Sequence, residues 1–123
     1  MSENQKRWRL LRDFKKEKFC FLIGVDNWSI ELQKSEFDSL YFLLLRINEE
    51  FLGIKNELMD EESINLELEQ MPWYIELDGR KNEWSLRFVF ESQDNTRSFE
   101  MYWPIPIAKN LFYEIKKMWE SMD

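Results

Sequence analysis

The stretch EFDSLYFLLLRINEEFLGIKNELM, residues 36–59, decides the fold of this chain of 123 residues. Its apolar side chains return every three or four positions, which is the spacing of one face of an α-helix. Ser35, with Asp38 three positions later, predicts the helix start through a capping box. A helix over 36–59 spans about 36 Å at 1.5 Å per residue, and Gly53 inside it costs about 1 kcal/mol relative to alanine. The apolar stripe consists of Phe37, Leu40, Leu44, Ile47, Phe51, Ile54 and Leu58.

Stretches with a two-residue period flank this helix, and that period is typical of strands with one buried face. Before the helix, the pattern predicts a strand from Arg7 to near Phe14, a turn over 15–18, an apolar strand over 19–23, a turn over 24–27 and a strand over 28–32. After the helix, it predicts strands over 64–69, 73–77, 84–91 and 99–103. Proline at position 72 interrupts the ladder, and Asp78-Gly79 predicts a hairpin turn.

A second helical stripe ends the chain, with Pro104 and Pro106 at its entry, where the fixed φ of proline is tolerated. Its apolar residues are Ala108, Leu111, Phe112, Ile115, Met118 and Trp119. The order predicts an α+β fold, in which an antiparallel sheet packs with one long central helix and one C-terminal helix, and a strand-to-helix unit occurs twice. Because no low-complexity linker divides the chain, we expect a single domain over residues 1–123.

The residue types argue against catalysis. The chain contains no histidine, which excludes histidine-based triads and histidine metal ligands. Its three glycines are too far apart for a phosphate-binding loop. The single cysteine, Cys20, lies in an apolar run, where a thiol acts as a small hydrophobic side chain. We therefore expect a protein that is not an enzyme and that uses no cofactor or metal.

The N-terminus has no apolar signal region, and no run of about 18 apolar residues occurs, so we expect a cytoplasmic protein with no membrane contact. The net charge of −7 is unevenly distributed. Residues 1–18 carry seven basic and three acidic side chains, whereas residues 49–69 carry eight acidic side chains and one basic. Only the N-terminal segment therefore attracts polyanions.

The strand alternation bears on nucleic-acid binding. If Trp28, Trp73, Trp84 and Trp103 point into the core, the opposite sheet face carries seven carboxylates and only one guanidinium, that of Arg87. Such a face repels a phosphate backbone, and inward tryptophans belong to the core rather than to a base-stacking platform. The seven carboxylates are those of Glu31, Glu67, Glu69, Glu76, Asp78, Glu91 and Glu100.

Two charged segments are candidate contact sites. The basic N-terminal segment is a candidate arm for nucleic acid or for the acidic region of a second copy; the alternative is an edge strand that its charges protect. Its residues are Lys6, Arg7, Trp8, Arg9, Arg12, Lys15, Lys16 and Lys18. The acidic cluster at the end of the long helix is a candidate surface for a protein partner, and the alternative is a solvated turn. Its residues are Glu57, Asp60, Glu61 and Glu62.

Four motifs together resemble a cyanobacterial family of small uncharacterised proteins: DNWSIEL at 26–32, EFD at 36–38, ELMDEE at 57–62 and SLRF at 85–88. The resemblance covers roughly residues 8–120. It implies the fold of the single-stranded-DNA-binding transcriptional regulators typified by the plant Whirly proteins and human positive cofactor four, with curved antiparallel sheets and helices that help build an oligomer. The lysine-rich Lys-Gly-Lys-Ala-type strand motif with which Whirly proteins bind DNA has no match here.

These observations lead to two hypotheses. The first is a non-enzymatic binding or regulatory module that acts by protein–protein contact, which the acidic surface and the missing catalytic residues favour. The alternative is a single-stranded nucleic-acid binder that uses the basic N-terminal segment. The large supply of aromatic residues is also compatible with a homodimer.

Overall fold

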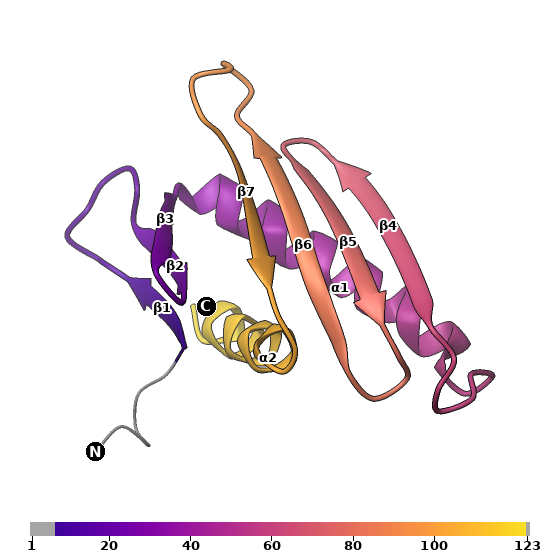
Figure 1. The fold of residues 1–123 in the computed structure, drawn as a ribbon. Coiled ribbons are helices and arrows are strands. Elements are labelled where there is room, and N and C mark those ends of the chain that lie inside the picture. The colour runs from indigo at the N-terminus through magenta and orange to yellow at the C-terminus, as the bar shows by residue number, and fades with distance from the viewer. Residues whose placement is uncertain (1–6, 123) are drawn as a thin grey trace.

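The computed structural model describes residues 7–122, which form two groups of strands, each followed by a helix (Figure 1). The first group is β1 (Trp8–Arg12), β2 (Phe21–Val25) and β3 (Trp28–Leu32), followed by α1 (Lys34–Lys55). The second group is β4 (Ile64–Gln70), β5 (Trp73–Gly79), β6 (Trp84–Glu91) and β7 (Ser98–Trp103), followed by α2 (Ile107–Glu120). The predicted α+β class is confirmed, and strands lead into a helix twice.

The strands form two antiparallel sheets, not the one sheet that the sequence predicted. One sheet has the order β1-β2-β3 and the other the order β4-β5-β6-β7. The prediction of one sheet was wrong because α1, with 22 residues, carries the chain about 33 Å away from β3. β4 therefore pairs with β5, its neighbour in sequence. Helix α1 packs on β4 and β5, whereas α2 contacts α1, β6 and β1 and so touches both sheets.

The inner faces of the sheets and the two helices enclose a hydrophobic core. Trp73, Trp84 and Trp103 are buried in it, as the alternation predicted, and Trp28 is half-buried at its margin. The indole Nε1 of Trp73 donates a hydrogen bond of 3.0 Å to the backbone carbonyl of Glu36. This bond ties β5 to the first turn of α1.

Helix α1 begins and ends earlier than predicted. Its N-cap is Gln33, whose N–H donates to the Glu36 carboxylate at 2.9 Å, so the predicted Ser35–Asp38 capping box was wrong. The helix ends at Lys55 rather than at residue 59, because Asn56 and Gly53 weaken its last turn. Leu58 still packs against the core from the following turn. Neither helix within residues 7–122 is both long and apolar enough to cross a membrane.

Two predicted turns are partly strand. Residues 24–25 belong to β2, and the turn consists of residues 26–27, with Asp26 at a φ of 55°. Gly79, predicted to form a turn with Asp78, is the last residue of β5. A Cβ at this position would lie 2.4 Å from the carbonyl oxygen of Glu83. The glycine is therefore required by a close approach of backbone, and not by a two-residue turn.

Gly79→Ala is expected to lower the free energy of unfolding by about 1–3 kcal/mol, because the added methyl group meets backbone rather than a movable side chain. Gly53→Ala is the matched control. Nothing lies within 4 Å of a Cβ there, so alanine should raise the free energy of unfolding by about 0.5–1 kcal/mol. Urea unfolding of the three proteins measures both changes, and two shifts of the same sign would contradict this account.

Candidate functional site

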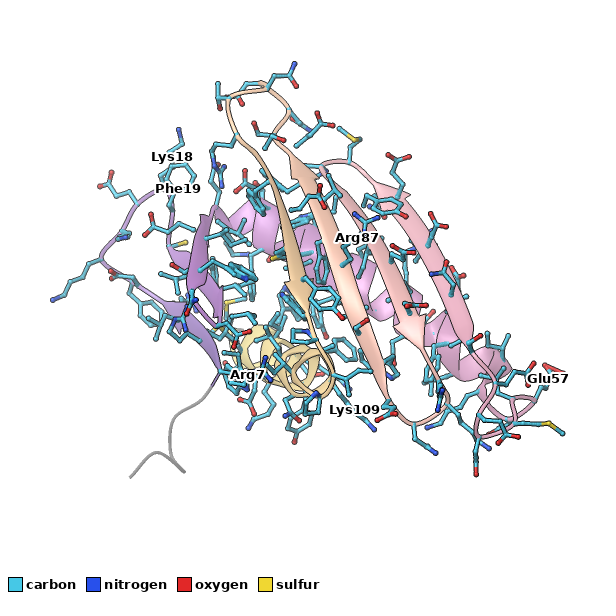
Figure 2. The ribbon with its side chains drawn as sticks, viewed as in Figure 1. Arg7, Lys18, Phe19, Glu57, Arg87 and Lys109 are labelled. Carbon is cyan, nitrogen blue, oxygen red and sulfur yellow. The ribbon has the colours of Figure 1, made fainter. Side chains whose placement is uncertain are left out.

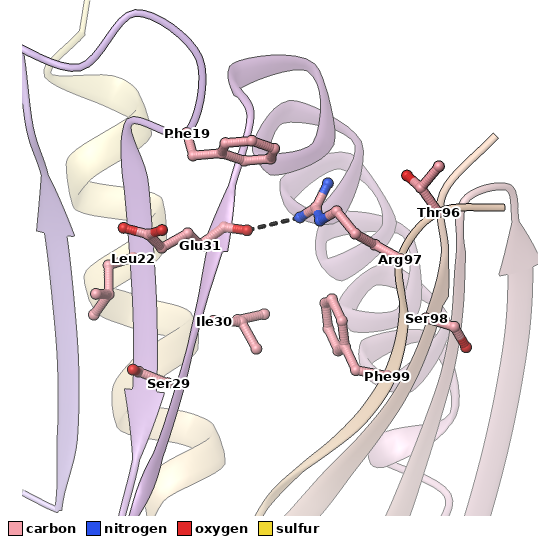
Figure 3. A pocket seen from close by; sticks show the side chains of 9 residues that line it. All are labelled: Phe19, Leu22, Ser29, Ile30, Glu31, Thr96, Arg97, Ser98 and Phe99. Carbon is pink, nitrogen blue, oxygen red and sulfur yellow. Dashed lines mark hydrogen bonds between the residues drawn. The ribbon is translucent and has the colours of Figure 1, made fainter. Parts of the chain in front are cut away.

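An open groove of about 760 Å³ lies between the two sheets. Its walls are β3 and β7, each an edge strand of its sheet. The half-buried side chains of Ile30 in β3 and Phe99 in β7 point toward each other across it (Figure 3). The groove thus has an apolar floor between two strand edges. Its lining also includes Phe19, Leu22, Ser29, Glu31, Thr96 and Ser98.

Arg97 crosses one end of the groove and connects the two sheets (Figure 3). Its Nη2 donates to the backbone carbonyl of Glu31 in β3 at 2.7 Å, and its Nη1 pairs with the Glu36 carboxylate at 2.8 Å. The guanidinium carbon lies 4.6 Å from the ring centroid of Phe19 and 5.2 Å from that of Phe90. Because the carboxylate of buried Glu36 neutralises this cation, Arg97 acts as a brace between the sheets.

The turn before β7 presents Arg97 to the groove. The Ser92 and Thr96 hydroxyls donate to the Asp94 carboxylate at 2.8 and 2.7 Å, and the Thr96 N–H donates to it at 3.1 Å. These hydrogen bonds, of which that from the Thr96 hydroxyl has the largest effect, hold the pKa of Asp94 at about 2. The Ser92 hydroxyl also accepts the Arg97 N–H at 3.0 Å. A network of short polar side chains therefore fixes the backbone of Arg97, from which its side chain extends to the groove.

Both groove strands direct backbone groups toward the groove. The carbonyl of Glu31 reaches Arg97 on the far side, so Ser29, two residues earlier, faces the same way. On the other wall, the carbonyl of Arg97 accepts from the Ser92 N–H and thus faces β6. Since hydrogen-bonding directions alternate along a strand, the backbone groups of Ser98 and Glu100 face the groove.

The sheet face turned away from the helices is acidic. The seven carboxylates that the sequence placed on one face are all exposed or half-buried, but Glu31 lies on the three-stranded sheet and the other six on the four-stranded sheet. Arg87, labelled in Figure 2, pairs with Glu76 at 3.1 Å and with Glu100 at 3.2 Å. Hydrogen bonds from Asn65 and then Arg87 lower the pKa of Glu76. The hydroxyl of Tyr74 donates to a further carboxylate, that of Glu67, which raises the tyrosine pKa to about 12.

Part of the basic N-terminal segment is an edge strand. Its residues 8–12 form β1 and pair with β2, and the half-buried Trp8 packs against the core. The strand ends at Arg12, before the predicted end near Phe14, because the Asp13 carboxylate accepts the Lys15 N–H at 2.9 Å and starts a turn. Residues 8–12 therefore form an edge strand, as one of the two alternatives predicted, and Lys6 lies outside the described residues.

Several basic side chains of this segment already have partners within the protein. Arg7 holds the Asp26 carboxylate with two bonds of 2.9 and 3.0 Å, which raises the pKa of Arg7 and lowers that of Asp26. Arg9 donates to the backbone carbonyls of Asp26 and Trp28 at 3.1 and 2.7 Å. Lys16 forms a salt bridge with Glu31. These cations brace the three-stranded sheet.

The remaining basic residues lie at the end of β1 and in the loop that connects β1 to β2. The guanidinium carbon of Arg12 is 4.3 Å from the ring centroid of Phe14, and the ammonium of Lys18 is 5.5 Å from that of Phe19. Lys15 is exposed in the loop between β1 and β2. Contact with nucleic acid through this segment stays a prediction.

The acidic cluster lies at the other end of α1 from the groove. Glu57, Asp60, Glu61 and Glu62 are exposed between α1 and β4, and Figure 2 shows Glu57 far from Phe19. The Met59 N–H donates to the Glu62 carboxylate at 3.1 Å, and the Met59 side chain is 70% exposed beside them. The structure thus keeps the two candidate surfaces apart by the length of α1, about 33 Å.

The sequence patterns predicted neither the groove nor the two residues that brace it. Glu36 was assigned only to the predicted helix, and Arg97 fell between the strands predicted over 84–91 and 99–103. One signal was available, because Arg87 and Arg97 are the only basic residues between positions 84 and 103. A cation in such an acidic, aromatic stretch commonly has a specific partner.

The chemistry that the groove offers is recognition by hydrogen bonds, charge and apolar contact. Its carboxylate, Glu31, is paired with Lys16, and its guanidinium, Arg97, with Glu36. Across residues 7–122, no three side chains of His, Cys, Asp or Glu gather in a way that could hold a metal ion. Cys20 is a half-buried free thiol that packs against the core.

These features define a class: a small α+β protein with two antiparallel sheets, two helices and an open groove between the sheet edges. A family model for a domain of unknown function, DUF1818, matches residues 3–118. The chain therefore belongs to the DUF1818 family.

The chain is also similar to a solved structure from Prochlorococcus sp. NATL2A, that of a protein with unknown function from the DUF155 family. The two share 35% sequence identity and a TM-score of 0.84, over 91% of this chain and 93% of the other. No curated protein matches the chain. The expected membership of a family of uncharacterised proteins is thus confirmed, and the chain is similar to a protein from a cyanobacterium.

The ion pair of Glu36 and Arg97 is expected to show a coupling energy of about 1–3 kcal/mol in a double-mutant cycle of Glu36→Gln and Arg97→Met, measured by urea unfolding. Glutamine keeps an acceptor for the Gln33 N–H, so the cycle isolates the charge pair. The exposed pair of Arg7 and Asp26 is the control, and Arg7→Met with Asp26→Asn should couple by no more than about 1 kcal/mol. Equal coupling in the two cycles would contradict the bracing role.

The turn at Asp94 is expected to lose stability in acid. The folded pKa of about 2 lies below the ordinary value of 3.8, so the contribution is complete above about pH 4 and is lost as the pH falls through 2. Urea unfolding of the wild type and Asp94→Asn between pH 7 and pH 2 measures it. The difference between the two should be constant from pH 7 to pH 5 and shrink below pH 4. A difference that persists undiminished at pH 2 would show that the carboxylate charge is not involved.

Proposed function

We propose that the protein is a non-enzymatic module that acts by binding another protein. The observation that carries this proposal is the groove between β3 and β7, where both sheets end in an open edge above a partly apolar floor. Unpaired strand edges are a common means by which proteins take up partner segments. The groups at the groove are suited to binding, and the pairings of Arg97 and Glu31 leave neither poised for proton transfer.

The charge of the surface supports a partner other than nucleic acid. The net charge is −7, and the outer face of the four-stranded sheet carries the carboxylates described above, of which Glu100 lies on β7 at the groove. A phosphate backbone approaching this face meets repulsion, whereas a basic or neutral protein segment does not. The groove, rather than the acidic cluster at residues 57–62, is the surface that we place first.

The second candidate is a single-stranded nucleic-acid binder with a Whirly-like architecture. The order of strands and helix, which occurs twice in the chain, is the observation that favours it. The basic residues of β1 and its loop would supply the contact. We rank it second because Arg7, Arg9 and Lys16 already hold partners within the three-stranded sheet.

Affinity purification of the tagged protein from its native cells, in nuclease-treated and untreated halves, tests the proposal. We expect a stoichiometric protein partner that remains after nuclease treatment. Glu100→Lys, beside the groove, should weaken recovery of this partner more than the double variant Glu61→Lys with Glu62→Lys, although the double variant removes one carboxylate more. Equal or greater loss with the latter pair would move the binding surface to the acidic cluster.

The same experiment tests the nucleic-acid candidate. Material lost on nuclease treatment, and lost as well in Lys15→Glu with Lys18→Glu, would favour that candidate over protein binding. These point variants are preferable to deletion of residues 1–18, because the deletion also removes β1 and its ladder with β2.

A further inference from the structure

We propose that the groove takes an extended segment of the protein partner, with apolar and basic side chains in alternation, as an added strand on the open edge of β7. This inference rests on the proposed function and names the chemistry of the partner. Pairing along β7, with six residues, gives the segment a length of about 20 Å at 3.4 Å per residue.

The open edge of β7 supplies the backbone contacts. Within residues 7–122, β7 pairs only with β6, and the backbone groups of Ser98 and Glu100 face the groove. Their side chains are exposed, so these two residues leave the edge open beyond the end of the groove that Arg97 crosses. The edge of β3 is less available, because Arg97 occupies the Glu31 carbonyl. An added strand therefore pairs with β7 and lies beside β3.

The alternation follows from the two faces of the added strand. Side chains on its inner face lie next to Phe99 and face Ile30, both half-buried and apolar. Side chains on its outer face lie next to Ser98 and Glu100 and face Glu31. Because side chains alternate across a strand, this groove favours every second residue apolar and the others polar or basic.

The charge of the outer residues follows from the surplus of carboxylates. Glu100 shares Arg87 with Glu76, so one guanidinium serves two carboxylates. Arg97, the cation that lines the groove, is neutralised by Glu36. Basic side chains on the outer face of the strand thus meet uncompensated negative charge, whereas acidic ones meet like charge.

The same charges disfavour two other occupants. Antiparallel pairing of β7 with β7 of a second copy would bring Glu91 and Glu100 of both copies to one surface, where like charges destabilise. Single-stranded DNA would place its phosphates against those carboxylates. A heterologous protein segment is the occupant that the groove fits.

The test uses a fluorescently labelled peptide, Lys-Val-Lys-Val-Lys-Val-Lys, titrated with the full chain and followed by fluorescence anisotropy. We expect saturable binding that weakens with salt. A peptide with glutamate for lysine, one with proline for the central valine, and a single-stranded oligonucleotide should each bind at least tenfold more weakly. Equal binding of the proline peptide, or tighter binding of the oligonucleotide, would overturn the proposal.

A matched pair of variants separates backbone from side chain at the β7 edge. Ser98→Pro removes the N–H that faces the groove, and we expect at least tenfold weaker binding. Ser98→Ala keeps that N–H and should bind like the wild type. If Ser98→Pro fails to fold by circular dichroism, peptides N-methylated either at the valines or at the lysines replace it. One of the two sets must then lose binding, and unchanged binding of both would overturn the added strand.

A second matched pair tests the charge. Glu100→Lys should weaken the lysine peptide by up to about fivefold, since a cross-strand charge pair is lost and a repulsion is added, and should strengthen the glutamate peptide. Glu61→Lys, with the same change of net charge at the far end of α1, should leave both peptides nearly unaffected. Equal effects of the two variants would attribute binding to net charge alone and overturn the groove as the site.

The outcomes separate this inference from the proposed function. If a nuclease-resistant partner binds Ser98→Pro as well as Ser98→Ala, the partner exists but does not add a strand to β7, and only the inference fails. If sedimentation shows self-association that Ser98→Pro abolishes, a second copy occupies the edge, and the inference fails as well. If neither partner nor peptide binds, both fail.

Discussion

The ion pair between Arg97 and Glu36 is the interaction on which the arrangement of the two sheets depends. The sheets share no ladder within the described chain, so the helices and this side chain set the space between them. The two residues are 61 positions apart, and the same guanidinium reaches the Glu31 carbonyl in β3. The Glu36 carboxylate also accepts the Gln33 N–H at the start of α1. Together, Glu36 and Arg97 thus connect the start of α1, the turn before β7 and the edge of β3.

The groove follows from this constraint. Arg97 contacts β3 at one end only, so the rest of the β7 edge faces β3 without a ladder, with Ile30 and Phe99 between them. Protein edges are commonly protected by charge or by proline. Here the β1 edge carries Arg9, which is turned onto Asp26 and Trp28, while the β7 edge presents a serine and a glutamate with their backbone groups open. This contrast makes β7 the edge suited to a partner.

The sequence predicted those parts of the fold that depend on local periodicity. The alternation of Trp73 to Leu77 and of Trp84 to Phe90 identified β5 and β6 and their buried faces, and the three- and four-residue spacing identified α1. The start of α1 was missed because glutamine is a weaker capping signal than Ser35. The hairpin predicted at Asp78-Gly79 is present between β5 and β6, but its turn lies over residues 80–83. The glycine is needed for a close approach of backbone to Glu83, which no local sequence pattern displays. The groove and its brace were missed because they join residues from β3, α1 and β7, and no local pattern encodes such contacts.

Amide hydrogen exchange of β7, read residue by residue by NMR with and without the lysine–valine peptide, tests the central claim most directly. The account predicts that in the free protein the N–H groups of Ser98 and Glu100 exchange rapidly, whereas those of Phe99 and Met101, which face β6, are protected. Addition of the peptide should slow exchange at Ser98 and Glu100. Uniform protection along β7 in the free protein, or no change at these two residues in the complex, would contradict it.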